Sequence, residues 1–168
     1  MYQLRGKLSI VMPAYNEEAL IYNSIMQTLS IVEQFAPDLE IIAVNDGSKD
    51  KTKQEIERAI RDDAKQPHPV VPGMRVSGTR IKLVTSNKNR GKGNAIISGI
   101  SQAEGDYIAF VDADLELNPA QLEGYLKKMQ ESGSDVVIGC KFHKDSELHY
   151  PFVRKVISLG YYMTVSYT

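Results

Sequence analysis

The sequence predicts an α/β fold, a mostly parallel sheet with helices on both faces. Short apolar segments rich in β-branched residues alternate with segments whose apolar residues recur at helical spacing, which is typical of parallel strands connected by helices. The strand-like segments are apolar throughout, as expected of strands covered on both faces. The length of 168 residues suits one ordinary domain better than two.

Five segments are predicted as strands because each is short, apolar and bounded by polar or turn-forming residues. They are residues 8–13, 39–45, 80–85, 106–111 and 135–139.

Four helices are predicted between these strands. The first follows strand 8–13, ends before Pro37, and has an apolar stripe made of Ile21, Ile25, Leu29, Val32 and Phe35. The others span residues 50–64, 92–103 and 119–131. The last has the clearest boundaries, since Asn118 can cap its free amides, Pro119 suits its first turn and Gly133 follows its end.

Two segments depart from this alternation. Residues 66–79 are rich in Pro and Gly, and we expect them to form a mobile insertion within the same domain. Residues 151–168 begin with a basic pair, Arg154 and Lys155, and continue with apolar residues to the last position. We expect them to start an amphipathic helix, which either lies on a membrane surface or packs against a further part of the protein. We therefore expect the sequence to be an amino-terminal fragment.

The composition excludes several classes of function. The formal net charge is −1 with both signs interspersed, so we expect no nucleic-acid partner. Cys140 is the single cysteine, which excludes an internal disulfide or a multi-cysteine zinc site and favours a cytoplasmic setting. No secretory signal begins the sequence and no apolar run is long enough to cross a bilayer. Contact with the cytoplasmic face of a membrane stays open.

Polar clusters follow four of the predicted strands, in residues 13–18, 45–48, 87–93 and 112–116. Ligands of open parallel sheets bind beyond the carboxyl ends of the strands. The clusters therefore predict one binding site on that edge of the sheet.

The centre of this predicted site is Asp112-Ala113-Asp114, because two closely spaced carboxylates can hold magnesium or manganese (Mg²⁺ or Mn²⁺) while a diphosphate completes the metal shell. Glu116 follows two residues later and adds a third carboxylate to this segment. Such acidic pairs also occur in turns and helix caps, but the position directly after an apolar strand favours the metal site.

Two further motifs belong to the predicted site. Asp46 is expected to accept hydrogen bonds from a base or ribose, although Asp46-Gly47 also suits a turn, and Asp50 is expected to cap the next helix. Gly91 and Gly93 flank Lys92 at a predicted helix start, where free amides attract phosphate. The spacing does not fit a P-loop.

Taken together, these motifs resemble those of glycosyltransferase family 2, inverting enzymes on the Rossmann-like nucleotide-diphospho-sugar transferase fold (GT-A type). The matching segments are residues 11–18, 45–52, 89–95 and 112–115. The chain looks most similar to the polyprenyl-phosphate branch, such as dolichyl-phosphate mannose or glucose synthases, because residues 139–142 read Gly-Cys-Lys-Phe and an Arg-containing segment follows.

The resemblance implies a nucleotide-sugar-binding domain over residues 1–150, with 151–168 on the acceptor side, truncated before the later acceptor motifs. It implies a GDP- or UDP-linked sugar donor, metal-assisted inverting displacement, and a lipid-phosphate or saccharide acceptor. Asp112 and Asp114 are the implied catalytic residues, and together with Glu116 they are the implied metal ligands. Glu116 departs from the Gln often found in this branch. The implied donor-binding residues are Pro13, Ala14, Tyr15, Asn16, Glu17, Asp46, Gly91, Lys92, Asp112, Ala113 and Asp114.

Two other functions stay open from the sequence. A non-catalytic nucleotide-sugar-binding module of a larger protein would need the same donor site. A sugar nucleotidyltransferase would share the sheet and the metal, but its glycine-rich loop after the first strand is replaced here by residues 13–18, Pro-Ala-Tyr-Asn-Glu-Glu.

Overall fold

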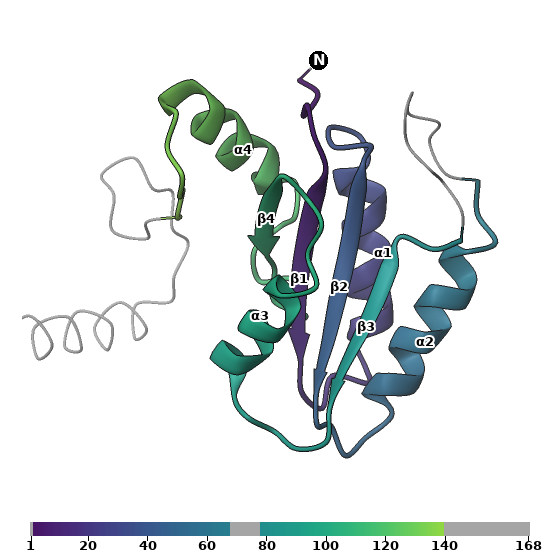
Figure 1. The fold of residues 1–168 in the computed structure, drawn as a ribbon. Coiled ribbons are helices and arrows are strands. Elements are labelled where there is room, and N and C mark those ends of the chain that lie inside the picture. Colours follow the sequence, from purple (N-terminus) through teal and green to yellow (C-terminus); the bar gives the residue numbers. More distant parts are fainter. Residues whose placement is uncertain (1, 68–77, 140–168) are drawn as a thin grey trace, which may run out of the picture. The chain divides into compact units, whose positions relative to one another are not determined.

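A computed structural model describes residues 2–67 and 78–139, and it confirms the predicted α/β class. Four parallel strands form one sheet in the order β3-β2-β1-β4 (Figure 1). The strands are β1 (Leu8–Ala14), β2 (Leu39–Asp46), β3 (Ile81–Ser86) and β4 (Tyr107–Phe110). The helices are α1 (Ile21–Val32), α2 (Thr52–Asp63), α3 (Lys92–Ile100) and α4 (Gln121–Ser132).

The two faces of the sheet have separate cores, because neighbouring residues of a strand point to opposite faces. Leu8, Ile10 and Met12 of β1 belong to the larger core, with side chains from α1, α2 and α4. Val11 and the β2 residues Ile42 and Val44 face the other way and pack with Ala95 of α3. The helices therefore cover both faces, as the sequence predicted.

Helix α3 lies close to the sheet because Gly99 has no side chain. A Cβ at Gly99 would lie only 2.3 Å from Val11 Cγ1 and 3.0 Å from Val44 Cγ2. Gly99→Ala is therefore expected to lower the free energy of unfolding by about 1 to 2 kcal/mol, since overpacking outweighs the gain in helix propensity. Urea denaturation measures this loss.

Gly124 is the matched control for this substitution, because it lies within α4 with nothing within 4 Å of a built Cβ. Gly124→Ala should raise stability by up to about 1 kcal/mol through helix propensity alone. A gain at both positions would show that α3 does not need its close approach to β1 and β2.

The predicted helix boundaries agree with the structure to within a few residues. Asn118 Oδ1 accepts the Ala120 amide at 3.0 Å, and Gly133 ends α4 in a left-handed conformation (φ 62°). Asp50 Oδ1 accepts the Thr52 amide at 3.0 Å at the start of α2. Phe35, predicted as part of the first helix, lies beyond the end of α1 but is still buried.

The predicted strand at residues 135–139 is wrong, because these residues have no strand conformation and Val136 is 74% exposed. An apolar, β-branched run favours an extended backbone, but a strand also needs a partner for its hydrogen bonds. Most of the predicted insertion at 66–79, Cys140 and the whole of 151–168 lie outside the described residues. No helix within residues 2–67 and 78–139 is long and apolar enough to cross a bilayer.

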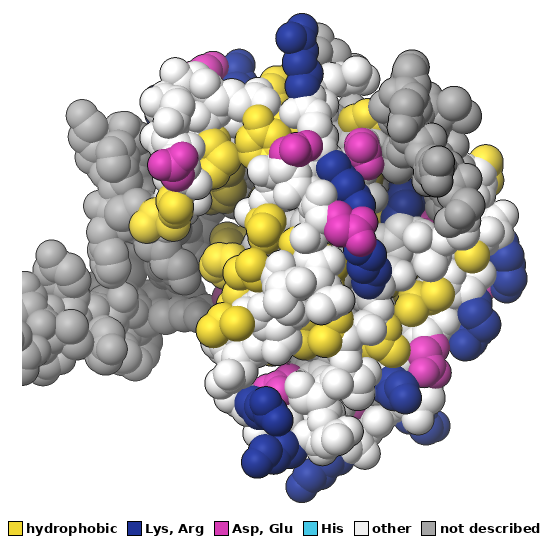
Figure 2. Space-filling view, in the orientation of Figure 1, with side chains coloured by type: hydrophobic (Ala, Val, Ile, Leu, Met, Phe, Trp, Pro, Cys, Tyr) yellow, Lys and Arg dark blue, Asp and Glu magenta, His cyan; other side chains and the backbone are white. Residues whose placement is uncertain are grey.

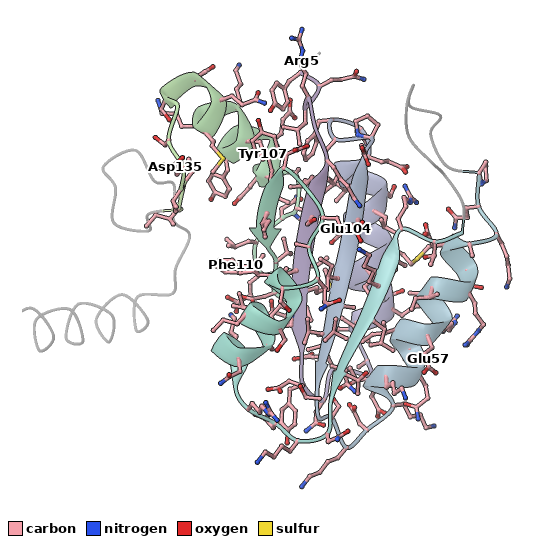
Figure 3. All side chains as sticks on the ribbon, in the orientation of Figure 1. Arg5, Glu57, Glu104, Tyr107, Phe110 and Asp135 are labelled. Carbon is pink, nitrogen blue, oxygen red and sulfur yellow. The ribbon has the colours of Figure 1, made fainter. Side chains whose placement is uncertain are left out.

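The prediction that every strand is covered on both faces is also wrong for β4. This strand is short, lies at the edge of the described sheet and pairs with β1. Ile108 is 47% exposed and Phe110 is 60% exposed, and Figure 3 labels Phe110 on this strand. Hydrophobic side chains of the described residues are visible on the surface in Figure 2. Ile97 and Ile100 of α3 are also exposed, at 67% and 42%.

Two charged networks hold the sheet to its connections. Buried Glu40 of β2 pairs with Lys7 (3.1 Å) and Lys82 (2.9 Å) and accepts the Ser9 hydroxyl at 2.6 Å. Both lysines also reach Glu104, in the loop between α3 and β4 (labelled in Figure 3). This network therefore joins three strands to that loop.

The second network lies between α2 and the start of β3. Asp63 is fully buried and pairs with Arg80 at 2.7 Å, while Arg80 also reaches Glu33 after α1 at 2.8 Å. Asp63 accepts the Arg80 amide and the Thr79 hydroxyl as well, at 2.7 and 2.9 Å. The carboxylate thus satisfies backbone and side-chain donors at once.

Candidate functional site

A cleft of about 350 Å³ lies beyond the carboxyl ends of β1, β2 and β4. Three loops and the first turn of α3 supply its walls. Most of the residues predicted from the strand-end motifs line it: Pro13, Ala14, Tyr15, Glu17, Asp46, Lys92, Asp112, Ala113 and Asp114.

Three predicted residues do not line this cleft, namely Asn16, Gly91 and Glu116. Two lining residues were not among the predicted ligands, Asn89 and Ala95. Asn89 begins a motif that the sequence does show, whereas Ala95 is an ordinary buried helix residue that no local pattern marks.

Asn16 holds the loop after β1 against the loop after β2. Its backbone is left-handed (φ 56°), its Oδ1 accepts the Lys49 amide at 2.9 Å, and its own amide donates to Ser48 Oγ at 3.0 Å. The next amide, from Glu17, donates to Thr52 Oγ1 at 2.8 Å. Asn16 therefore orients its neighbours Tyr15 and Glu17 toward the cleft instead of lining it.

Asp46 anchors the loop that precedes α3. Asp46 is buried, with 3% of the residue exposed, and its carboxylate accepts the backbone amides of Arg90 (3.0 Å) and Gly91 (2.8 Å). Gly47 makes this close approach possible, since a Cβ there would lie 2.4 Å from the Lys88 carbonyl carbon. The Gly91 amide, predicted to be free for phosphate, is instead donated to Asp46.

The turn after β4 is held through the residue between its two aspartates. Ala113 is buried, and its carbonyl accepts the Ser24 hydroxyl of α1 at 2.5 Å. Leu115 then adopts a left-handed backbone (φ 51°), and its amide donates to the Asp112 carbonyl at 3.1 Å. This anchoring leaves Asp112 and Asp114 on the wall of the cleft.

The predicted set of three metal ligands is not assembled. Glu116 is exposed outside the cleft, beyond the left-handed turn at Leu115, and its amide donates to Asp114 Oδ1 at 3.1 Å. Residues 2–67 and 78–139 contain no group of three or more acidic, His or Cys side chains placed to hold a metal. Asp112 and Asp114 remain as the carboxylate pair of the cleft.

The cleft carries several negative charges and one positive charge. Burial raises the pKa of Glu17, and the nearby carboxylates of Asp114 and Asp50 raise it further. Lys92 Nζ lies 2.6 Å from Asp112 Oδ1. Two aspartates facing a negative cleft suit magnesium or manganese, which are commonly held by one or two carboxylates together with substrate phosphates.

Comparison with known proteins identifies related sequences. The family described as Glycosyl transferase family 2 matches residues 9–164. An undecaprenyl-phosphate 4-deoxy-4-formamido-L-arabinose transferase of Enterobacter sp. (strain 638) is 35% identical over 131 residues, which is 78% of this chain and 36% of that protein. The enzyme of the same name from Photorhabdus laumondii is 33% identical over 152 residues, 90% of this chain and 42% of that protein. The chain therefore spans about two fifths of the length of these relatives.

Solved structures share the fold. A mannosyltransferase from Pyrobaculum calidifontis, in complex with GDP-Man and Mn²⁺, superposes with a TM-score of 0.58 at 23% identity. The match covers 75% of this chain and 33% of that protein. The similarity supports the GT-A type of sheet predicted from the sequence.

Proposed function

Because this chain belongs to glycosyl transferase family 2, we propose that it carries the donor-binding site of a glycosyltransferase. The reaction moves a sugar from a GDP- or UDP-linked donor to a polyprenyl phosphate by metal-assisted inverting displacement. One observation carries the proposal: Asp112, Asp114 and Lys92 line a single cleft together with the loop that follows β1.

The nucleoside is proposed to bind against the loop that follows β1. Tyr15 is 40% exposed and, with Pro13, supplies apolar surface for a base. Glu17 lines the same wall, so its carboxyl lies where it can form hydrogen bonds with a base or ribose. Asp46 contributes by positioning the loop before α3, because its carboxylate accepts two amides of that loop.

The diphosphate is proposed to bind between α3 and the Asp112–Asp114 turn. The first-turn amides of a helix have no carbonyl partner within the helix and carry partial positive charge, and Lys92 adds an ammonium beside them. Asp112 and Asp114 would hold the divalent cation. When bound, the cation neutralises charge that develops on the departing diphosphate.

A polyprenyl phosphate is the proposed acceptor because the relatives are named undecaprenyl-phosphate transferases. A phosphate oxygen is already ionised near neutral pH, so this acceptor requires no strong base. A lipid acceptor would also bring the site to a membrane surface, for which we propose the cytoplasmic face. A saccharide acceptor is the alternative, and its hydroxyl would require a general base.

Calorimetry of nucleoside diphosphate binding tests the donor site. GDP and UDP are titrated with and without Mn²⁺, and one of them is expected to bind more tightly with the metal. Asp114→Ala should weaken the metal-dependent binding about tenfold or more, since one of two carboxylate ligands is lost. Asp114 is exposed, so the melting temperature should change little.

Glu116→Gln is the control, because Glu116 is an acidic residue close to Asp114 in sequence but outside the cleft. Its nucleotide affinity with Mn²⁺ should match that of the unmodified chain. Unchanged affinity in Asp114→Ala would falsify the metal role, and a loss in Glu116→Gln equal to that in Asp114→Ala would restore Glu116 as a ligand.

A further inference from the structure

Lys92 and Asp112 form an ion pair inside the cleft. Lys92 is the first residue of α3, Asp112 follows β4, and the atoms Nζ and Oδ1 lie 2.6 Å apart. Among the described residues that line the cleft, Lys92 alone is basic, whereas Glu17, Asp46, Asp112 and Asp114 are acidic. The ammonium therefore lies at one of the two carboxylates proposed to hold the cation.

We propose that Lys92 is an exchangeable counter-ion that couples cation binding to diphosphate binding. This inference rests on the proposed function. In the free chain Lys92 pairs with Asp112. The Asp112 carboxylate is therefore less available to a divalent cation. When a nucleoside diphosphate binds, Lys92 pairs with a phosphate oxygen and Asp112 becomes free to ligate the cation.

The strength of the pair suits such an exchange. The Lys92 side chain is 58% exposed and that of Asp112 is 42% exposed, and ion pairs this open to water are weak. A diphosphate carries more negative charge than one carboxylate, and charge-assisted contacts to phosphate are strong. The ammonium can therefore leave Asp112 at little cost when a diphosphate arrives.

The other acidic residues of the cleft do not compete equally for Lys92. The Asp46 carboxylate is buried and already accepts the amides of Arg90 and Gly91. Asp114 Oδ1 accepts the Glu116 amide. Asp112 is the carboxylate to which Lys92 is paired, so removal of the lysine should act mainly on Asp112.

The test is direct measurement of Mn²⁺ binding, by calorimetry or by the electron paramagnetic resonance signal of free Mn²⁺. Without nucleotide, Lys92→Met should bind Mn²⁺ about two- to fivefold more tightly than the unmodified chain, because an exposed pair no longer competes. With GDP or UDP present, the unmodified chain should gain more Mn²⁺ affinity than Lys92→Met does. Lys88→Met is the matched control, since Lys88 is an exposed lysine of the loop that precedes α3 and does not line the cleft.

A double-mutant cycle with Asp112→Asn separates competition at Asp112 from a general change of charge. In the Asp112→Asn background, Lys92→Met should change Mn²⁺ affinity no more than Lys88→Met does. Equal Mn²⁺ affinity of Lys92→Met and the unmodified chain without nucleotide overturns the inference. If Mn²⁺ improves neither GDP nor UDP binding in any variant, the proposed function fails instead, while the nucleotide-free comparison still reports on Lys92.

Discussion

Asp63→Ala is expected to lower the free energy of unfolding by about 3 to 5 kcal/mol, because it leaves a buried charge without its main partner. Arg80 is 8% exposed and donates to Asp63 through its amide, Nε and Nη2, at 2.7, 3.2 and 2.7 Å. After the substitution, Glu33 at 2.8 Å is the remaining carboxylate partner of Arg80 among the described residues. The substitution removes the ion pair and hydrogen bonds that connect the end of α2 to the start of β3.

Urea denaturation followed by circular dichroism measures this loss, and Asp62→Ala is the control. Asp62 is the neighbouring carboxylate and also forms ion pairs, with Lys65 at 3.0 Å and Arg58 at 3.9 Å, but these lie on the surface. Its removal should cost far less than the removal of Asp63. Similar losses in the two variants would mean that burial does not set the strength of the Asp63 network.

The second large effect is a pH-dependent contribution of Glu40 to stability. The side chain of Glu40 is buried, which by itself raises its pKa, but hydrogen bonds from Ser9 and Lys82, the Glu104 amide and Lys7 lower it to about 2 from 4.5. A folded-state pKa below the unfolded value stabilises the fold above pH 4.5. This contribution, on the order of 3 kcal/mol, should be lost as the pH falls from 4.5 toward 2.

Comparison of the unmodified chain with Glu40→Gln over a pH series separates the contribution of Glu40 to stability from that of the other carboxylates. The difference in the free energy of unfolding should be largest near pH 6 and should shrink steadily below pH 4.5. Glu57→Gln is the control, because Glu57 lies on the surface of α2 with Lys53 at 3.7 Å (labelled in Figure 3). A difference for Glu40→Gln that stays constant from pH 6 to pH 3 would contradict the proposed charge network.

The elements that the sequence predicted correctly are those with strong local signals. The first four strands are apolar runs between turn residues, and the boundaries of α4 follow from Asn118 and Gly133. The segment at residues 135–139 has the same local signal, yet it forms no strand. Its backbone preference is local, but strand formation depends on a partner that the composition of the segment does not identify.

The sequence also predicted most, but not all, of the residues that line the candidate site. The motifs after β1, β2 and β4 led to most of the cleft lining, because the carboxyl ends of parallel strands meet at one edge. The motifs did not reveal which of these residues face the cleft. Asn16 and Gly91 instead hold the loops in place, and Glu116 lies beyond the turn at Leu115.

The sequence by itself determined the class of fold, the parallel arrangement and the edge of the sheet at which the cleft lies, since apolar periodicity and turn chemistry are properties of neighbouring residues. Only the tertiary structure decided the partners of the charged groups: Asp46 with the amides before α3, Lys92 with Asp112, and Glu40 with Lys7 and Lys82. Each of these contacts joins elements that are distant along the chain. They form only when the strand order β3-β2-β1-β4 and the packing of α3 bring those elements within hydrogen-bonding distance.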